Sequence, residues 1–274
     1  MDIALCTENG IIYSAVEFSR LHPTDLGHLR RLLRCPECNG QAFFRRSSRN
    51  RRTPCFGARP HADMCSLAAQ DYVRPDDEAT GDGICVPQPP NRIVVDFGYG
   101  AHDQWEPAGL GTVTSVRRQV DIVDGIRSGS ASPARRRLSS LLRMLIKSPD
   151  FGFSEQILEM FGQEIVARNI FVPLLDVTER HEGRRMLFWG MLSDARYGAD
   201  YSYRQLWLNG GGRNNVSFCI QADHVEHILL RYRAVEPEDF AGAYALIFGR
   251  LRFSQAGKPY CIVDDPDHVA LRLT

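Results

Sequence analysis

The sequence has no long hydrophobic run. No stretch of its 274 residues reaches the roughly eighteen consecutive apolar residues that a membrane-spanning helix needs. The chain starts with Met1 and Asp2, whereas a secretory signal peptide starts with a basic segment. We therefore expect a soluble, cytoplasmic protein that has no membrane partner.

The sequence also lacks the short motifs of the common enzyme classes. It has no Gly-x-Ser-x-Gly elbow, no His-Glu-x-x-His pair, no Walker phosphate loop and no carboxylate cluster suited to two metal ions. Catalysis is therefore not indicated, and a binding role is favoured.

Lysine is scarce, because Lys147 and Lys258 are the only two lysines among 33 basic residues. The net charge is zero, yet residues 20–74 hold 11 basic against 4 acidic side chains, and residues 117–147 hold 8 against 2. Arginine carries a planar guanidinium group that pairs with phosphate and stacks on rings. The two basic blocks therefore favour nucleic acid as a partner.

The composition is that of a globular protein, with 43% hydrophobic and 24% charged residues. A chain of this length folds as one large or two medium domains. We expect an α+β fold with four segments. They are a zinc-binding module at 1–74, a linker or irregular extension at 75–131, a short helical segment at 132–170 and a small OB-like β-barrel at 171–274.

The cysteines are clustered. Five of the eight lie between residues 35 and 85, and in a chain without secretory features such thiols are more often metal ligands than disulfides. Cys35 and Cys38 form a Cys-x-x-Cys turn, and His61 and Cys65 follow. Zn²⁺ accepts Cys and His together in closed structural sites. We predict one structural Zn²⁺ bound by these four residues, with Cys55 as an alternative ligand.

An arginine-rich run separates the two halves of this cluster. Residues 45–52 contain five arginines and no acidic side chain, which creates a strong local positive potential. We interpret the run as an exposed loop that contacts nucleic-acid backbone without reading sequence. A solvated loop without a ligand is the alternative. The arginines concerned are Arg45, Arg46, Arg49, Arg51 and Arg52.

The same region resembles a known family. The Cys-Pro-Glu-Cys motif, the basic spacer and the Cys-Phe-Gly-Ala-Arg-Pro-His-Ala-Asp-Met-Cys segment at 55–65 are similar to the zinc-binding N-terminal region of competence protein CoiA-like sequences, over about residues 1–70. The resemblance implies a role in DNA uptake, recombination or defence, with a nuclease core downstream. The chain departs from the family in having Cys55 where the first motif has His, and no spaced Asp, Glu-x-Lys set follows residue 70.

The middle of the chain contains the clearest helical pattern. Ser132 suits an N-cap, Pro133 suits the first helical position, and leucines recur at helical spacing until Ser148. We predict a basic amphipathic helix there, a second helix from Ser154 to Phe161, and a strand at 92–97. The basic helix contacts nucleic acid or a partner groove, or it packs as an ordinary helix with solvated arginines. Its candidate contact residues are Arg135, Arg136 and Arg137.

From residue 185 onward the pattern changes to short alternating runs. Six runs are predicted as strands, and an amphipathic helix at 222–232 lies between the third and the fourth. Three strands, a helix and two further strands is the element order of an OB-fold, although other small barrels share it. The six runs are 186–193, 203–209, 216–220, 244–254, 259–263 and 269–273.

Strand alternation assigns faces in this predicted barrel. Leu206 and Leu208 point into the core, which leaves Trp207 on the outer surface. Aromatic rings beside arginines suit a single strand, whose bases stack while its phosphates pair with cations. Packing of Trp207 and the tyrosines against the preceding helices is the alternative. The candidate nucleic-acid-binding residues of the barrel are Tyr203, Trp207, Arg213, Arg250 and Arg252.

Together these features predict a non-catalytic accessory protein that binds single-stranded DNA or RNA and delivers it to a partner protein such as a helicase or nuclease. Two alternatives remain from the sequence. One is a CoiA-like DNA nuclease with a divergent active site. The other is a protein-interaction scaffold in a DNA-processing or defence complex.

Overall fold

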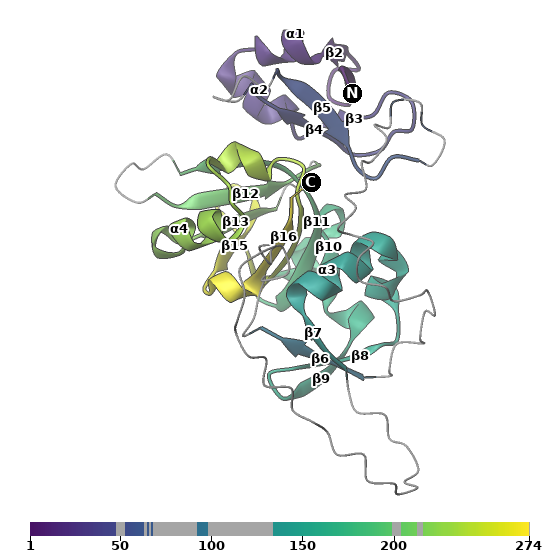
Figure 1. Ribbon diagram of the computed structural model, residues 1–274, viewed down its shortest axis with the longest axis vertical. Coiled ribbons are helices and arrows are strands. Elements are labelled where there is room, and N and C mark those ends of the chain that lie inside the picture. The colour runs from purple at the N-terminus through teal and green to yellow at the C-terminus, as the bar shows by residue number, and fades with distance from the viewer. Residues whose placement is uncertain are drawn as a thin grey trace, which may run out of the picture.

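The computed structural model describes residues 1–47, 53–62, 65, 67, 92–97, 134–198, 204–212 and 216–273. These residues build two hydrophobic cores, one between residues 4 and 65 and a larger one between residues 93 and 271. In Figure 1 the N-terminal part lies above the larger body, and a small four-stranded sheet that shares the larger core lies at the lower end of that body. Within the described ranges, no helix has the length and apolarity needed to cross a membrane.

The N-terminal part, hereafter the module, combines two short helices with two small sheets. Ser14 begins the first helix with a capping box. Its hydroxyl accepts a hydrogen bond from the Glu17 N–H, and the Glu17 carboxylate accepts one from the Ser14 N–H. Phe18 meets Phe44 and Phe56 edge to face, Phe44 and Phe56 are tilted against each other, and the ring centres are 5.0–5.5 Å apart in this core. The elements are β1 (Ile3–Cys6), β2 (Ile12–Ser14), α1 (Ala15–Ser19), α2 (Pro23–Leu29), β3 (Leu33–Arg34), β4 (Ala42–Arg45) and β5 (Cys55–Ala58).

A four-stranded sheet of order β7-β6-β8-β9 begins the larger core. Its central strand β6 runs parallel to both β7 and β8, and its Ile93 and Val95 lie in the larger core. The strand predicted at 92–97 is therefore confirmed. The elements are β6 (Arg92–Asp96), β7 (Ala134–Arg137), α3 (Leu138–Lys147), β8 (Ile157–Met160) and β9 (Gln163–Val166).

The predicted start of the basic helix is several residues too early in the sequence. Residues 134–137 form β7, and α3 begins only at Leu138. The reason is tertiary, because the edge of β6 supplies backbone partners that hold these residues extended. Within α3, Leu138, Leu141, Leu142 and Leu145 are buried, as the helical spacing predicts. Residues 132 and 133 lie outside the described residues.

The second predicted helix is wrong, because residues 157–166 form the β8–β9 hairpin. Phe161 and Gly162 occupy the turn with φ values of 52° and 74°, the pair of positive φ angles that a tight hairpin turn requires. Leu158 and Met160 are buried, whereas Ile157 and Glu159 are only half-buried. This alternation of burial is that of a strand. In the sequence alone, an apolar pattern over only four residues does not distinguish a strand from a helix.

The C-terminal region contains a closed five-stranded β-barrel. Strands follow the order β11-β12-β13-β15-β14, and β11 pairs with β14 to close the ring. Each of the six predicted runs contains a strand and the predicted helix is confirmed, although β12 begins only at Leu206 and residue 203 of that run lies outside the described residues. The elements are β11 (Arg185–Tyr197), β12 (Leu206–Gly210), β13 (Ser217–Ile220), α4 (Ala222–Arg231), β14 (Tyr244–Phe253), β15 (Pro259–Val263) and β16 (Val269–Arg272).

Short elements extend this barrel. Strand β10 (Phe171–Pro173) pairs in parallel with the first half of β11, and β16 pairs with β14. The predicted faces are confirmed, because Leu206 and Leu208 are fully buried while Arg250 and Arg252 are exposed. Single 3₁₀ turns lie at η2 (Pro149–Phe153), η3 (Ala167–Asn169), η4 (Leu174–Asp176), η5 (Glu179–His181), η6 (Pro237–Phe240) and η7 (Pro266–His268).

Candidate functional site

Two loops of the module bring four metal-ligand side chains together. Cys35 and Cys38 lie in the turn between β3 and β4, and His61 and Cys65 follow β5. Their ligand atoms all lie within 4.8 Å of one another. These are the four residues that the spacing predicts, so the structure is compatible with a metal site at this position.

The distances within the group fit a small tetrahedral ion. Cys35 Sγ lies 3.7 Å from Cys65 Sγ, and Cys38 Sγ lies 3.4 Å from His61 Nδ1. With Zn–S bonds of about 2.3 Å and a Zn–N bond of about 2.0 Å, the edges of a tetrahedron are about 3.8 Å and 3.5 Å. All three thiols are free rather than oxidised to a disulfide. The donor set and these two distances are therefore compatible with a metal ion at this position.

The backbone brings the two loops close to each other. The Cys35 N–H donates to the Gly40 carbonyl, and the Arg59 N–H donates to the carbonyl of Gln41 on the opposite loop. A Cβ atom at Gly40 would overlap the carbonyl oxygen of Pro60, so only glycine permits this approach. The ligand geometry thus depends on both loops.

The thiols differ in acidity. A hydrogen bond from the backbone of Ala62 is the largest cause that lowers the pKa of Cys38, to about 6, so this thiol is ionised at neutral pH. Burial raises the pKa of Cys65 to about 11. A metal ion must displace the Cys65 proton when it binds, and its affinity therefore falls as the pH falls.

The alternative ligand Cys55 is placed elsewhere. It lies in β5, directly opposite Arg45 of the neighbouring strand β4, and it does not belong to the group of four. The structure thus gives Cys55 no part in the candidate metal centre.

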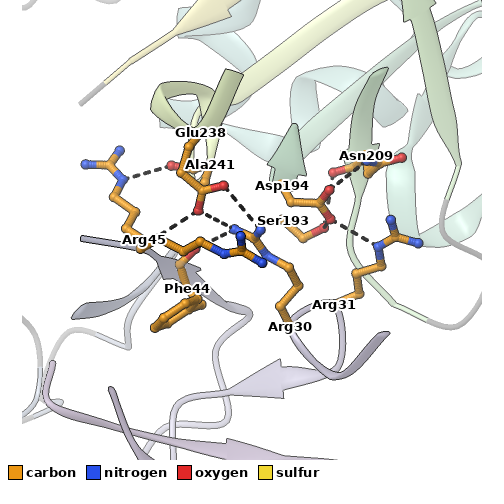
Figure 2. Close-up of polar contacts among 10 residues, drawn as sticks. Arg30, Arg31, Phe44, Arg45, Ser193, Asp194, Asn209, Glu238 and Ala241 are labelled. Atoms are coloured by element: carbon orange, nitrogen blue, oxygen red, sulfur yellow. Dashed lines mark hydrogen bonds and ion pairs between the residues drawn. The ribbon is translucent and has the colours of Figure 1, made fainter. Parts of the chain in front are cut away.

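The module is joined to the barrel by a seam of buried ion pairs (Figure 2). The Arg30 guanidinium donates to both carboxylate oxygens of Glu238, at 2.6 and 3.2 Å, and to the Phe44 carbonyl at 2.8 Å. The side chains of this pair are only 6% and 15% exposed. Removing one partner of such a pair leaves a buried charge without its counter-ion, so we expect the pair to couple the module to the barrel.

A second pair connects the seam to the outer face of the barrel. Arg31 Nε donates to Asp194 Oδ2 at 3.0 Å, and Asn209 Nδ2 donates to Asp194 Oδ1 at 2.7 Å. Ser193 and Ser217 extend the buried network through hydrogen bonds to Asp194 and Asn209. Burial raises the pKa of Asp194, but the charges of Arg30 and Arg31 outweigh it and leave the pKa below its usual value.

The first arginines of the basic run also face the seam. Arg45 Nε donates to the Ala241 carbonyl at 3.0 Å, and the Arg46 N–H donates to Glu238 at 3.3 Å. The Arg45 guanidinium lies 5.4 Å from the centre of the Phe43 ring. Arg45 therefore serves the contact between module and barrel, a role that its local sequence does not indicate. Arg49, Arg51 and Arg52 lie outside the described residues.

Strand register aligns a row of side chains around the outer face of the barrel. Arg185 on β11 lies opposite Arg250 on β14, and Trp207 on β12 lies opposite Arg196 at the far end of β11. All three arginines are exposed, and Trp207 is half-buried. In order around the barrel, this basic row is Arg185, Arg250, Ile262, Cys219, Trp207 and Arg196.

The row unites predicted residues with two that were not predicted. Trp207 and Arg250 belong to it, and Arg252 is exposed on the same face of β14. Arg185 and Arg196 were missed because their positions follow from the pairing of β11 with two different strands. Tyr203 and Arg213 lie outside the described residues, as does the side chain of Arg135.

The remaining predicted arginines of the middle segment lie on β7. Arg136 is exposed and Arg137 is half-buried.

Comparison of the chain with protein-family models gives no match, and comparison with curated proteins gives none either.

Proposed function

We propose that this protein is a non-catalytic, nucleic-acid-binding accessory protein. A zinc-stabilised module is fixed to an OB-type barrel, and the basic row of that barrel binds a single strand. The observation that carries the proposal is the row itself, which contains three exposed arginines, a half-buried Trp207 next to one of them, Arg196, and no acidic residue.

The strand order supports an OB-type barrel. Numbered along the chain, its strands follow the ring first, second, third, fifth, fourth, with a helix after the third. The third and fifth strands, β13 and β15, are parallel, whereas the other ring pairs are antiparallel. The basic row leaves β11 at Arg185 and returns to it at Arg196, which is the stagger that closing a barrel requires. OB-folds bind oligonucleotides on the face of their second and third strands, where Trp207 lies here.

The chemistry of the row suits a polynucleotide backbone and its bases. A nucleobase stacks on an indole whatever its sequence, and guanidinium groups on either side pair with phosphates. Between Trp207 and Arg250 the row holds Cys219, which is buried, and Ile262, which is half-buried, so apolar contact with bases there would come from Ile262. Such a face binds without strict sequence preference.

Zinc would have a structural role. The group of four offers a complete set of protein ligands, which is typical of closed structural sites rather than catalytic ones. It would stiffen the two loops that carry Gln41 and Arg59, and the Arg59 guanidinium donates to the Gly242 carbonyl of the barrel at 3.4 Å. A relation to CoiA-like proteins, a partner enzyme and a role in defence remain predictions from the sequence.

Trp207→Ala should weaken binding of a single-stranded oligonucleotide by about 5- to 150-fold, which is about 1 to 3 kcal/mol, because one stacked base is lost. Fluorescence anisotropy measures the affinity, and thermal unfolding checks the fold. The melting temperature should change little. A large fall in melting temperature with unchanged affinity would show instead that Trp207 is a packing residue.

Salt dependence separates binding of nucleic acid from a protein-scaffold role. The logarithm of the affinity for a single strand should fall linearly with the logarithm of the salt concentration, since each neutralised phosphate releases counterions. Arg196→Ala should flatten that slope, whereas Arg168→Ala, at an exposed arginine outside the row, should not. Absence of binding to any oligonucleotide at low salt would favour the scaffold.

A further inference from the structure

A cluster of four aromatic rings continues the basic row at its β14 end. Phe161 stacks on Phe97 with ring centres 4.8 Å apart and planes only 16° from parallel. Phe248 lies 5.3 Å from Phe97 and 5.4 Å from Phe161, and His268 meets all three rings edge-on. The cluster joins the β8–β9 hairpin, the end of β6, strand β14 and η7 in one place.

Phe161 is the outermost ring of this cluster. It is 64% exposed, whereas Phe248 beneath it is 5% exposed. Its φ of 52° is uncommon for any residue other than glycine, asparagine or aspartate, and the turn position it occupies is usually filled by those residues. The hairpin thus holds a large ring in solvent, supported from below, at a position where a small polar residue fits better.

Register places this ring cluster beside the arginines of the row. Phe248 is two residues before Arg250 on β14, so both side chains are on the outer face, and Arg250 lies opposite Arg185. Burial lowers the pKa of His268 most, the carboxylate of Asp265 raises it, and the positive charge of Arg185 lowers it again, which leaves the pKa below its usual value. The charged groups that act on the cluster are therefore Arg185 and the acidic side chains at 264, 265 and 267.

The spacing between the two aromatic positions fits a polynucleotide. Trp207 on β12 and Arg250 on β14 are separated by β13 and β15, which amounts to three strand spacings of about 4.8 Å, and Phe248 lies two residues, or about 7 Å, from Arg250 along β14. Trp207 and Phe248 are thus about 16 Å apart along the surface. Stacked nucleotides advance by about 3.4 Å each, so about five nucleotides span the distance.

We infer that Phe161, supported by Phe97 and Phe248, is a second base-stacking platform for the single strand that crosses Trp207. Arg185 and Arg250 hold the phosphates between the two platforms. The inference rests on the proposed function, and it adds the direction in which the strand crosses the barrel. The strand runs across the β-strands, from Arg196 and Trp207 toward the β8–β9 hairpin.

The test compares Phe161→Ala with Phe153→Ala on the full chain. Phe153 is a matched control, since it is 58% exposed and lies in η2, outside the ring cluster. The probes are oligothymidylates and oligouridylates of about 4, 8 and 12 nucleotides, which distinguish DNA from RNA. Phe161→Ala should weaken binding of the 12-mer at least about 5-fold. Phe153→Ala should change it less than about 2-fold.

Length dependence and rescue give two further readouts. Wild-type affinity should rise between the 4-mer and the 8-mer as the strand reaches both platforms, and Phe161→Ala should remove that rise. Phe161→Trp should restore it, because an indole also stacks. Equal effects of Phe161→Ala and Phe153→Ala, with Trp207→Ala still weakening binding, would overturn this inference alone. A wild-type protein that binds none of the probes would overturn the proposed function itself.

Discussion

Cys38→Ser should release bound zinc and unfold residues 1–65 while the barrel stays folded. Closed zinc sites contribute about 10 to 16 kcal/mol of apparent binding free energy in zinc-finger peptides, and that energy is available only to the folded state. The module has sheets of only two and three strands and a small core, so it depends on such a contribution. The barrel has a separate core and should persist.

Elemental analysis and hydrogen exchange together measure this outcome. Wild-type protein should contain about one zinc per chain, and the variant under about a tenth. Backbone amides of Leu33 and Phe44 should lose protection in the variant, whereas those of Leu208 and Ile247 should keep theirs.

Cys55→Ser is the matched control, since it removes a thiol of the same module that lies outside the group of four. It should retain the metal. Freshly purified, never-chelated wild-type protein with under about a tenth of an equivalent of any metal would exclude the site. Loss of metal from Cys55→Ser but not from Cys65→Ser would make Cys55 the fourth ligand instead.

Asp194→Ala should lower the free energy of unfolding by about 3 to 5 kcal/mol, because it leaves the Arg31 guanidinium in the seam without its carboxylate. The side chains of this pair are 15% and 4% exposed, and Asn209 also loses its acceptor. Urea unfolding of wild type, Asp194→Ala, Arg31→Ala and the double variant measures the coupling between the two residues. The double variant should lose much less than the sum of the single losses.

An exposed ion pair supplies the control for this seam. Arg168 and Glu155 pair with side chains 53% and 69% exposed, so Glu155→Ala should cost at most about 1 kcal/mol. If Asp194→Ala costs no more than Glu155→Ala, the seam does not hold the module to the barrel.

Lowering the pH should weaken the ion pair between Arg31 and Asp194. The pKa of Asp194 in the folded protein is below its unfolded value, so the pair stabilises the fold above the unfolded pKa of about 3.9. That contribution is lost as the pH falls through the folded pKa. Asp194→Asn carries no such titration, and its stability should depend less on pH in this range.

The metal group and the barrel strands could be determined from the sequence because their signals are local. Cys35 and Cys38 lie in one turn, and His61 and Cys65 are of residue types that bind zinc, so few other residues nearby could complete the candidate site. Alternation around Leu206, Trp207 and Leu208 has the period of a strand, and burial confirms it.

The roles of residues whose partners are distant in the sequence became clear only from the tertiary structure. Arg45 belongs to a basic run in the sequence, but its partner Ala241 lies 196 residues away. Residues 134–137 are extended because β6 lies beside them, although they precede a strong helix. Phe161 contacts Phe248 on β14 only because the β8–β9 hairpin packs against that strand. Strand pairing and ion pairs between distant segments leave no local periodicity, and so they appear only when the chain has folded.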